Sequence, residues 1–244
     1  MQNVVTGYRV KLIEKRMAAE GTLAVDLEKP PGFTFTPGQA AELMLLDPPE
    51  TDDEGDFRTF SIAAAPSEPV LTFATRLRDT AFKRVLRDAP LGTEINLDGP
   101  FGSFTLHDDP STPAVFLAGG IGITPFLSMI REAAGRPSGP WLYLFYSNRR
   151  PEDAPFLDEL SAIEQRCGRV RVIATMGQMD HSSRRWTGER GVIDGAMLGR
   201  HLPAIEGPIY YVAGPPGMVA AMRAMLGNAG VKADHVRAED FGGY

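Results

Sequence analysis

Hydrophobic and polar residues alternate in short runs over the first hundred residues, a period of two that is typical of half-buried β-strands. Turn residues separate these runs, for example at residues 30–32 and 37–38. Residues 81–88 follow a helical spacing instead, with Thr80 as the predicted N-cap. We therefore predict one helix within an antiparallel sandwich or barrel, whose strands lie at residues 8–13, 22–27, 41–46, 58–62, 70–76 and 93–97.

The pattern changes after His107, where continuous apolar runs begin to alternate with helical ones. The runs predict strands at residues 114–118, 141–146, 170–175 and 208–213, and helices at residues 126–134, 154–165, 195–201 and 217–229. Such alternation implies right-handed crossovers and a doubly wound parallel sheet. We therefore predict two domains, residues 1–108 and residues 109–244.

Charge and cysteine content exclude several classes of protein. The 25 basic and 31 acidic residues give a net charge of −6, which argues against a nucleic-acid partner. The single cysteine, Cys167, can form neither an internal disulfide nor a four-cysteine iron–sulfur site. No metal site is predicted, because no ligand spacing relates the four histidines, His107, His181, His201 and His235.

Residues 110–130 and residues 47–56 each allow two interpretations. Residues 110–130 are uncharged and long enough to span a membrane, but glycines and prolines interrupt them. We interpret them as a buried strand, a glycine turn and the start of a helix, and predict no membrane span. Residues 47–56 contain six acids and two prolines, which favours a solvated surface loop over a partner-facing one. No apolar signal segment follows Met1, so we expect a cytoplasmic protein.

Two glycine-rich turns are the strongest candidates for a binding site. Residues 119–125 follow an apolar strand and open a helix, and residues 214–218 do the same later in the chain. Glycine lets the backbone approach a ligand closely, and a helix N-terminus offers free amides to a pyrophosphate. Both turns would lie at the carboxyl ends of parallel strands, where open α/β sheets bind ligands. We therefore predict a nucleotide site there.

A third segment, residues 58–61, reads Arg-Thr-Phe-Ser within a predicted strand. Arginine can bind a phosphate through two parallel hydrogen bonds, although such a strand is commonplace by itself. Together with both glycine turns and residues 99–104, this segment resembles the ferredoxin–NADP reductase-like flavoprotein superfamily over essentially the whole chain. With one cysteine, the chain resembles members without an iron–sulfur domain. The resemblance implies a flavin-binding antiparallel β-barrel followed by an α/β domain that binds NAD(P).

The resemblance also implies roles for residues of the barrel. Arg58, with Thr59 beside it, would contact the flavin pyrophosphate, and Phe60 would pack on the flavin. Ser61 would act catalytically by hydrogen bonding near flavin N5, the atom that receives hydride. The flavin wall would continue at Thr75 and Arg76, with Lys83 on a phosphate and Tyr244 over the flavin ring.

In the second domain, the resemblance implies that Thr124 approaches the nicotinamide and acts in catalysis. The implied nucleotide-binding residues are Gly119, Gly120, Gly122, Thr124, Pro125, Gly214, Pro215 and Met218. Ala213 departs from the family, which usually has cysteine there and uses it in the nicotinamide pocket. The helical spacing of Met218, Met222 and Met225 favours core positions for all three.

Nucleotide choice rests on basic residues after the second and third strands of the parallel sheet. Arg149, Arg150, Arg184 and Arg185 are candidates for a 2′-phosphate site. Residues 174–176 lack the Ser–Arg pair of NADP-specific members, and residues 186–192 resemble NADH-linked relatives. We therefore predict a dual or NADH preference.

The implied function is an FAD-dependent NAD(P)H oxidoreductase. Hydride would pass from the nicotinamide to flavin N5, and electrons would then leave to a separate acceptor, such as a ferredoxin, another redox protein or a small molecule. Two alternatives stay open. One is an NAD(P)H:flavin reductase with flavin as a diffusible substrate, and the other is a flavin-binding electron-transfer subunit without reductase activity.

Overall fold

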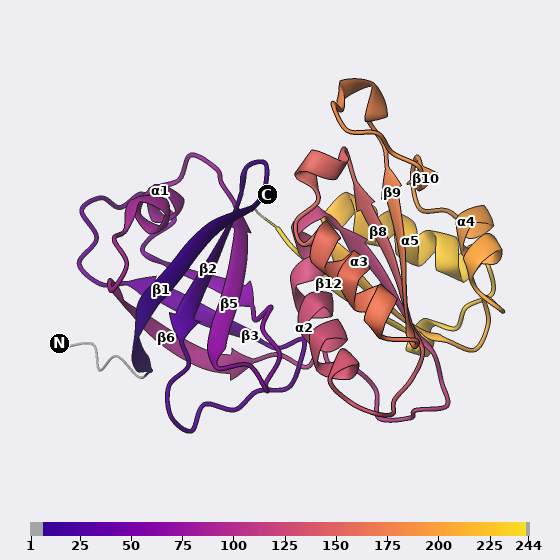
Figure 1. Ribbon diagram of the computed structural model, residues 1–244, viewed down its shortest axis with the longest axis horizontal. Coiled ribbons are helices and arrows are strands. Elements are labelled where there is room, and N and C mark those ends of the chain that lie inside the picture. The colour runs from indigo at the N-terminus through magenta and orange to yellow at the C-terminus, as the bar shows by residue number, and fades with distance from the viewer. Residues whose placement is uncertain (1–6, 243–244) are drawn as a thin grey trace.

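The computed structural model describes residues 7–242 and contains two six-stranded sheets, one antiparallel and one parallel. Figure 1 shows the antiparallel sheet and the parallel sheet side by side, each with its own helices. The predicted fold class is therefore confirmed. The chain leaves the first sheet at Phe101 and enters the second at Ala114, and these residues bracket the proposed domain boundary.

The first sheet runs in the order β4-β3-β6-β1-β2-β5, and all its pairs are antiparallel. Its strands are β1 (Tyr8–Ala19), β2 (Thr22–Glu28), β3 (Ala40–Leu45), β4 (Phe57–Ser61), β5 (Val70–Arg76) and β6 (Glu94–Phe101). A hydrogen bond from the Ala63 amide to the Thr72 carbonyl, 2.8 Å long, joins the chain just beyond β4 to β5. The two outer strands therefore meet, and the sheet closes into a barrel.

One helix, α1 (Ala81–Asp88), packs on the barrel. Phe82 and Leu86 lie on its apolar face and join the barrel's interior cluster, which includes Leu43 and Ile62. Burying a phenylalanine or leucine side chain contributes roughly 1.5–3 kcal/mol relative to leaving it exposed. These contacts fix the N-terminus of α1 beside the end of β4.

The second sheet runs in the order β10-β9-β8-β7-β11-β12, and its pairs are parallel. Its strands are β7 (Ala114–Gly119), β8 (Leu142–Asn148), β9 (Val170–Met176), β10 (Glu189–Arg190), β11 (Ile209–Gly214) and β12 (Val236–Asp240). Its helices are α2 (Ile123–Ala134), α3 (Leu157–Arg166), α4 (Gly195–His201) and α5 (Pro216–Asn228). Short 3₁₀ turns occupy Gly120–Gly122, Pro151–Asp153, Met179–His181 and Ala233–His235.

The central strand β7 shows that helices cover both faces of this sheet. Phe116 and Ala118 belong to the cluster that contains α2 and α3, whereas Val115 and Leu117 belong to the cluster that contains α4 and α5. Alternate side chains of a strand point to opposite faces, so burial on both faces requires a continuous apolar run. That requirement explains the uninterrupted sequence of β7.

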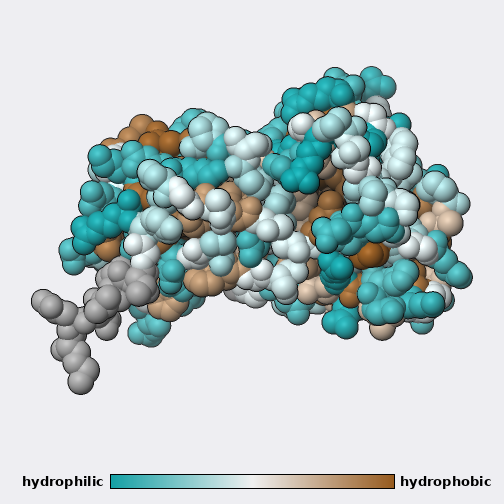
Figure 2. Space-filling model, turned by 90° about the horizontal axis from the view of Figure 1, so that it is seen from below, coloured by the Kyte–Doolittle hydropathy of each residue, from teal (hydrophilic) through white to brown (hydrophobic). Residues whose placement is uncertain are grey.

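Polar contacts hold the two domains against each other. Ser128 of α2 donates a 2.6 Å hydrogen bond to the Ala64 carbonyl of the barrel domain. Arg131, whose side chain is only 11% exposed, forms ion pairs with Glu68 (3.2 Å) and with Glu159 of α3 (2.6 Å). In the space-filling view the molecule narrows between the two domains, and hydrophilic residues are spread over the surface of both (Figure 2).

The structure adds details that the sequence pattern did not predict. The third predicted helix begins at Leu157 rather than at residue 154, because a 3₁₀ turn occupies Pro151–Asp153. The two-residue strand β10 was also missed, since two residues give no periodicity. Among residues 7–242, no helix combines the length and the apolar character needed to cross a membrane.

Candidate functional site

The two glycine turns lie side by side. Ala213 of β11 pairs with Ala118 of β7, so the turn after each strand opens at the same edge of the parallel sheet. A Cβ atom added to Gly122 would lie 2.3 Å from the Ala213 carbonyl oxygen, so only glycine fits this close approach. The turns therefore support each other at the predicted nucleotide site.

Gly120 is the most open residue of the first turn. Its φ of +53° falls in the left-handed region that favours glycine, and a Cβ there would meet nothing within 4 Å. The Tyr146 hydroxyl of β8 shares its one proton between the carbonyls of Gly120 (3.2 Å) and Pro155 (3.1 Å). Burial raises the pKa of Tyr146, which keeps this hydroxyl protonated as the donor.

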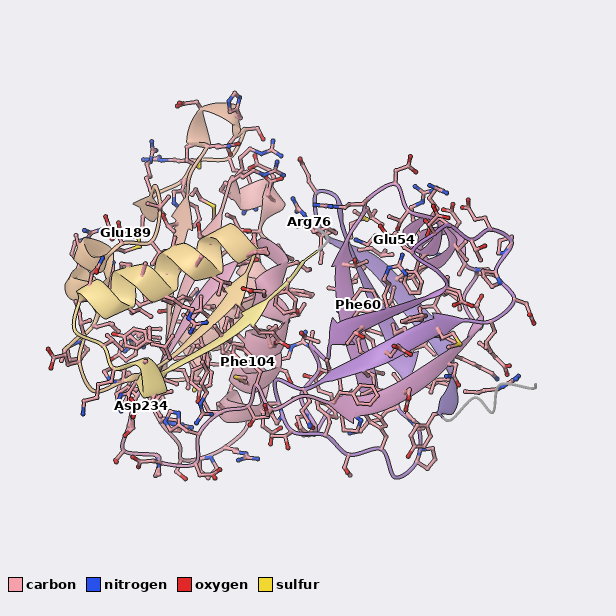
Figure 3. All side chains as sticks on the ribbon, turned by 180° about the vertical axis from the view of Figure 1, so that it is seen from behind. Glu54, Phe60, Arg76, Phe104, Glu189 and Asp234 are labelled. Atoms are coloured by element: carbon pink, nitrogen blue, oxygen red, sulfur yellow. The ribbon has the colours of Figure 1, made fainter. Side chains whose placement is uncertain are left out.

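A cleft of about 1020 Å³ extends from the two turns to the barrel. Figure 3 shows Arg76, at the end of β5, where the two domains meet. The cleft is lined by Gly119, Gly120, Pro215 and Met218 from the turns, by Arg76 and Arg78 from the barrel, and by Asn148, Arg149, Asp153, Gln178, Val192 and Asp194. Met222 and Met225 also line it, so the three methionines of α5 serve both the cleft and the core beneath it. Its size suits a dinucleotide.

Few of the arginines predicted for a 2′-phosphate reach this cleft. Arg149 lines it, but Arg150 is held by Asp153 (2.9 Å) and Glu20 (2.8 Å). Arg184 lies in a different depression, where its guanidinium forms a 3.7 Å ion pair with Asp158. The cleft therefore offers a 2′-phosphate only one of the predicted cations.

The predicted flavin-binding strand, β4, runs beside α1 on the barrel. The guanidinium of Arg58 stacks on the Phe82 ring at 5.2 Å from its centre, and the Phe60 ring lies 5.9 Å from the same ring. Thr59 is exposed and pairs with Glu42 of β3. These contacts fix Arg58 next to the N-terminus of α1, as a phosphate-binding role requires.

Buried hydroxyls near this strand fit a bound cofactor. The Ser61 and Thr80 hydroxyl oxygens are both buried, and neither has a hydrogen-bond partner within residues 7–242. Burying a hydroxyl without a hydrogen bond costs free energy, so each of these two hydroxyls indicates a ligand that forms the missing hydrogen bond. Lys83 is 7% exposed, and burial, with the charges of Arg78 and Arg58, lowers its pKa. A desolvated ammonium group there favours an anionic ligand.

The other predicted residues divide into three groups. Thr75 is buried in β5, and Arg76 donates a 3.1 Å hydrogen bond to the Thr22 hydroxyl. Thr124 is buried in the first turn of α2, where its hydroxyl donates to the Ile121 carbonyl (3.0 Å) beside a buried Pro125. Tyr244 lies outside the described residues. The catalytic roles of Ser61 and Thr124 stay predictions.

Glu239 was missed by the sequence reasoning. It lies on β12 opposite Ala213, where the family usually has cysteine in β11. Its Oε2 atom is buried without a partner in the described chain, and desolvation raises its pKa. An acidic residue in this short strand does not stand out in the sequence. Glu239 is recognised as a candidate site residue only because β12 pairs with β11.

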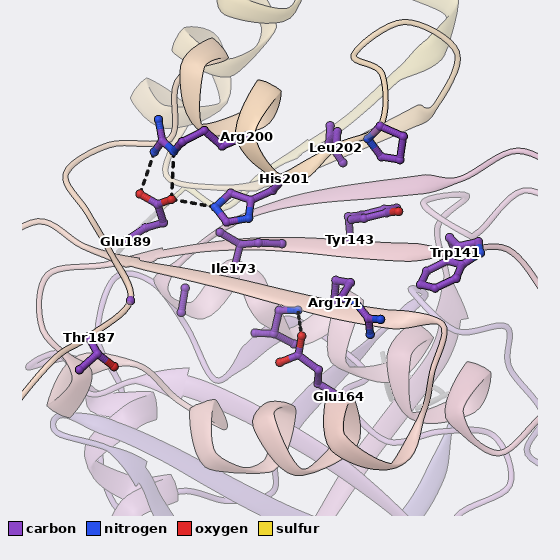
Figure 4. A pocket seen from close by; sticks show the side chains of 14 residues that line it. Trp141, Tyr143, Glu164, Arg171, Ile173, Thr187, Glu189, Arg200, His201 and Leu202 are labelled. Atoms are coloured by element: carbon purple, nitrogen blue, oxygen red, sulfur yellow. Dashed lines mark hydrogen bonds and ion pairs between the residues drawn. The ribbon is translucent and has the colours of Figure 1, made fainter.

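A second cleft, of about 1000 Å³, lies over β8 and β9 away from the glycine turns (Figure 4). Trp141 and Tyr143 form one end of it. At the other end, the Glu189 carboxylate forms an ion pair with Arg200 (2.7 Å) and a hydrogen bond with His201 (2.7 Å), so the charges of Glu189 and Arg200 already offset each other. The cleft between the turns and the barrel is therefore the better candidate site.

Comparisons with known proteins agree with this site. A family model described as the oxidoreductase NAD-binding domain matches residues 116–224, which contain both glycine turns. The chain is 30% identical to the glycine betaine monooxygenase reductase subunit of Chromohalobacter salexigens over 96% of its own length, and it spans 63% of that protein. It is 29% identical to Ferredoxin–NADP reductase B of Sorangium cellulosum, of which it covers 97%.

The fold comparison supports the two-domain architecture. A ferredoxin NADP⁺ reductase from Neisseria gonorrhoeae, solved with bound FAD and NADP, superimposes with a TM-score of 0.80 over 96% of this chain and 98% of the other, at 19% identity. The chain thus has that two-domain fold, paired glycine turns and an Arg-x-Phe-Ser strand, and its sequence is similar to those of known reductases. These similarities agree with the resemblance of the chain to the ferredoxin–NADP reductase-like superfamily of flavoprotein oxidoreductases.

Proposed function

We propose that this chain is an NAD(P)H-dependent flavoprotein reductase that passes reducing equivalents to a separate acceptor. The observation that carries the proposal is the cleft in which the paired glycine turns face the end of β5 across the domain boundary. A nicotinamide held by one domain could then meet a flavin held by the other, and such positioning is what these enzymes supply to their cofactors. The reductase relatives support the same class of reaction.

In the proposed nicotinamide site, backbone rather than charged side chains binds the pyrophosphate. The 3₁₀ turn at Gly120–Gly122 leads directly into α2, and the positive end of the helix dipole favours an anion. Pro215 and Met218 form an apolar wall that excludes water from the bound nucleotide. Tyr146 keeps the turn in place through the Gly120 carbonyl.

In the proposed flavin site, Arg58 and Lys83 bind phosphate and the Thr80 hydroxyl completes that contact. The flavin, when bound as FAD, supplies a hydride acceptor at N5 and releases electrons singly. Ser61 donates its buried hydroxyl to the flavin near N5, which satisfies an otherwise unpaired group and fixes the ring. The cytoplasmic location stays a prediction.

The proposed acceptor is a ferredoxin, another redox protein or a small molecule. The relatives include reductase components of oxygenase systems, which supports a protein acceptor. Arg84 and Arg87 are basic residues of α1 on the surface of the barrel. Carboxylates already neutralise them, because Arg84 forms ion pairs with Glu50 and Asp79, and Arg87 forms one with Asp88.

We also propose that NADH is used at least as well as NADPH, because only Arg149 among the predicted cations reaches the cleft. Steady-state kinetics with both nucleotides tests this. A specificity constant about tenfold higher for NADPH, equal to about 1.4 kcal/mol, would refute it.

The flavin content of the purified protein tests the principal proposal. Stoichiometric FAD supports a resident cofactor. A colourless protein that turns over added flavin supports the alternative, a flavin reductase. One observation favours that alternative: Asp52 and Glu54 already contact the proposed phosphate-binding groups.

A further inference from the structure

The acidic loop of residues 47–56 is anchored to the barrel rather than simply solvated. Asp52 accepts a 2.6 Å hydrogen bond at Oδ2 from the amide of Ala81, the first residue of α1. Glu54 forms a 2.7 Å ion pair with Arg58, and its carbonyl oxygen accepts a 2.8 Å hydrogen bond from the same guanidinium. Glu50 pairs with Arg84 on the other side of α1 (2.7 Å).

Two of these contacts involve groups of the proposed phosphate site. Arg58 and the N-terminus of α1 are where the flavin phosphates would bind, and each already holds a carboxylate of the loop. The arrangement resembles a bound anion, because Asp52 also lies 4.0 Å from the Arg58 guanidinium. Figure 3 labels both Glu54 and Phe60 on the barrel domain.

The surroundings favour an anion at this place. Arg58 is only 18% exposed, Lys83 is buried close by, and the Thr80 hydroxyl has no partner within the described chain. Without a ligand, the loop carboxylates offset the mutual repulsion of these cations. The Glu54 side chain is 63% exposed and its carboxylate is held by Arg58, so the side chain can rotate away while the backbone contacts of Glu54 stay in place.

We propose that Asp52 and Glu54 form an internal plug that occupies the flavin-phosphate site and must be displaced before a flavin nucleotide binds. The proposal rests on the flavin site proposed above. Because only the plug-released state binds the nucleotide, the apparent dissociation constant is the intrinsic one divided by the fraction of protein in that state. Riboflavin lacks phosphate, so its binding does not require displacement of the plug.

The test is a flavin titration of the flavin-free protein, followed by flavin fluorescence, for wild type, Asp52→Ala, Glu54→Ala and the double variant. We expect FAD to bind about tenfold more tightly to the double variant, from typical strengths of a helix-end contact and an exposed ion pair. Asp53→Ala is the matched control. The substitution removes the same charge from the same loop, but the Asp53 side chain has no hydrogen-bond or ion-pair partner in the described chain. It should change FAD affinity less than threefold, and no variant should tighten riboflavin binding.

Each outcome decides between the proposals. Unchanged or weaker FAD binding by the double variant overturns the plug, while FAD binding by wild type leaves the flavin function standing. An equal gain in Asp53→Ala, or an equal gain for riboflavin, also overturns it, because net charge would then explain the effect. If neither wild type nor any variant binds a flavin, the proposed function itself fails.

Discussion

Replacing Arg58 with alanine tests whether the flavin phosphates bind at β4. The guanidinium is 18% exposed and is held in place by the Phe82 ring and by carbonyls of residues 54, 55 and 57. The fold therefore orients Arg58 before any ligand arrives. Its loss should weaken FAD binding specifically, because no other arginine takes part in these contacts.

The magnitude follows from two opposed effects. A hydrogen bond to a charged group contributes about 1.5–3 kcal/mol, and Arg58→Ala removes it. The variant also removes the ion pair with Glu54, which competes with FAD and is worth about 0.2–1 kcal/mol as an exposed pair. The net loss is about 0.5–2.8 kcal/mol, which corresponds to between about twofold and a hundredfold in the dissociation constant.

The assay is titration of the flavin-free variant with FAD, with thermal unfolding measured beside it to show that the barrel is intact. Arg58→Lys is the matched control, since lysine keeps the charge but cannot make two parallel hydrogen bonds. We expect an affinity between those of wild type and Arg58→Ala. Full FAD affinity in Arg58→Ala would refute the assignment of this strand to the flavin phosphates.

Three further changes probe the rest of the site. Gly122→Ala forces a Cβ against the backbone of β11, so urea unfolding should show a loss of about 1–3 kcal/mol; unchanged stability would contradict the close approach. Tyr146→Phe leaves the Gly120 and Pro155 carbonyls without their donor and should lower the free energy of unfolding by about 1–3 kcal/mol. Unchanged stability would show that this hydroxyl does not hold the turn. Glu239 has a raised pKa, so the folded state binds more protons and wild-type stability should fall as pH rises above 4.5, the ordinary value for glutamate. Glu239→Gln should make that fall smaller, and unfolding curves with the same pH slope in both proteins would contradict it.

The architecture could be predicted because its determinants are local. The period of two in the barrel and the apolar runs of the parallel sheet each reflect the burial of that strand alone, as β7 shows. The glycine turn of residues 119–125 was recognisable because its chemistry lies within seven consecutive residues. The position of the second turn beside it followed from the parallel sheet.

The missed features depend on contacts between distant parts of the chain. Asp52 lies 29 residues before the amide it caps, and nothing in the acidic run indicates that partner. Tyr146 resembles any apolar strand residue until the Gly120 carbonyl appears beside its hydroxyl. The pairing of Arg150 with Glu20, 130 residues apart, likewise removed a predicted phosphate ligand that spacing alone had suggested.

Reduction of bound flavin by a nicotinamide nucleotide tests the central claim most directly. The FAD-loaded protein should be mixed rapidly with NADH, and separately with NADPH, in the absence of oxygen. The account predicts that the flavin absorbance band bleaches with at least one of them, and with NADH at least as efficiently. A protein that holds FAD but shows no bleaching with either nucleotide would contradict the proposed reductase and favour a flavin-binding subunit without that activity.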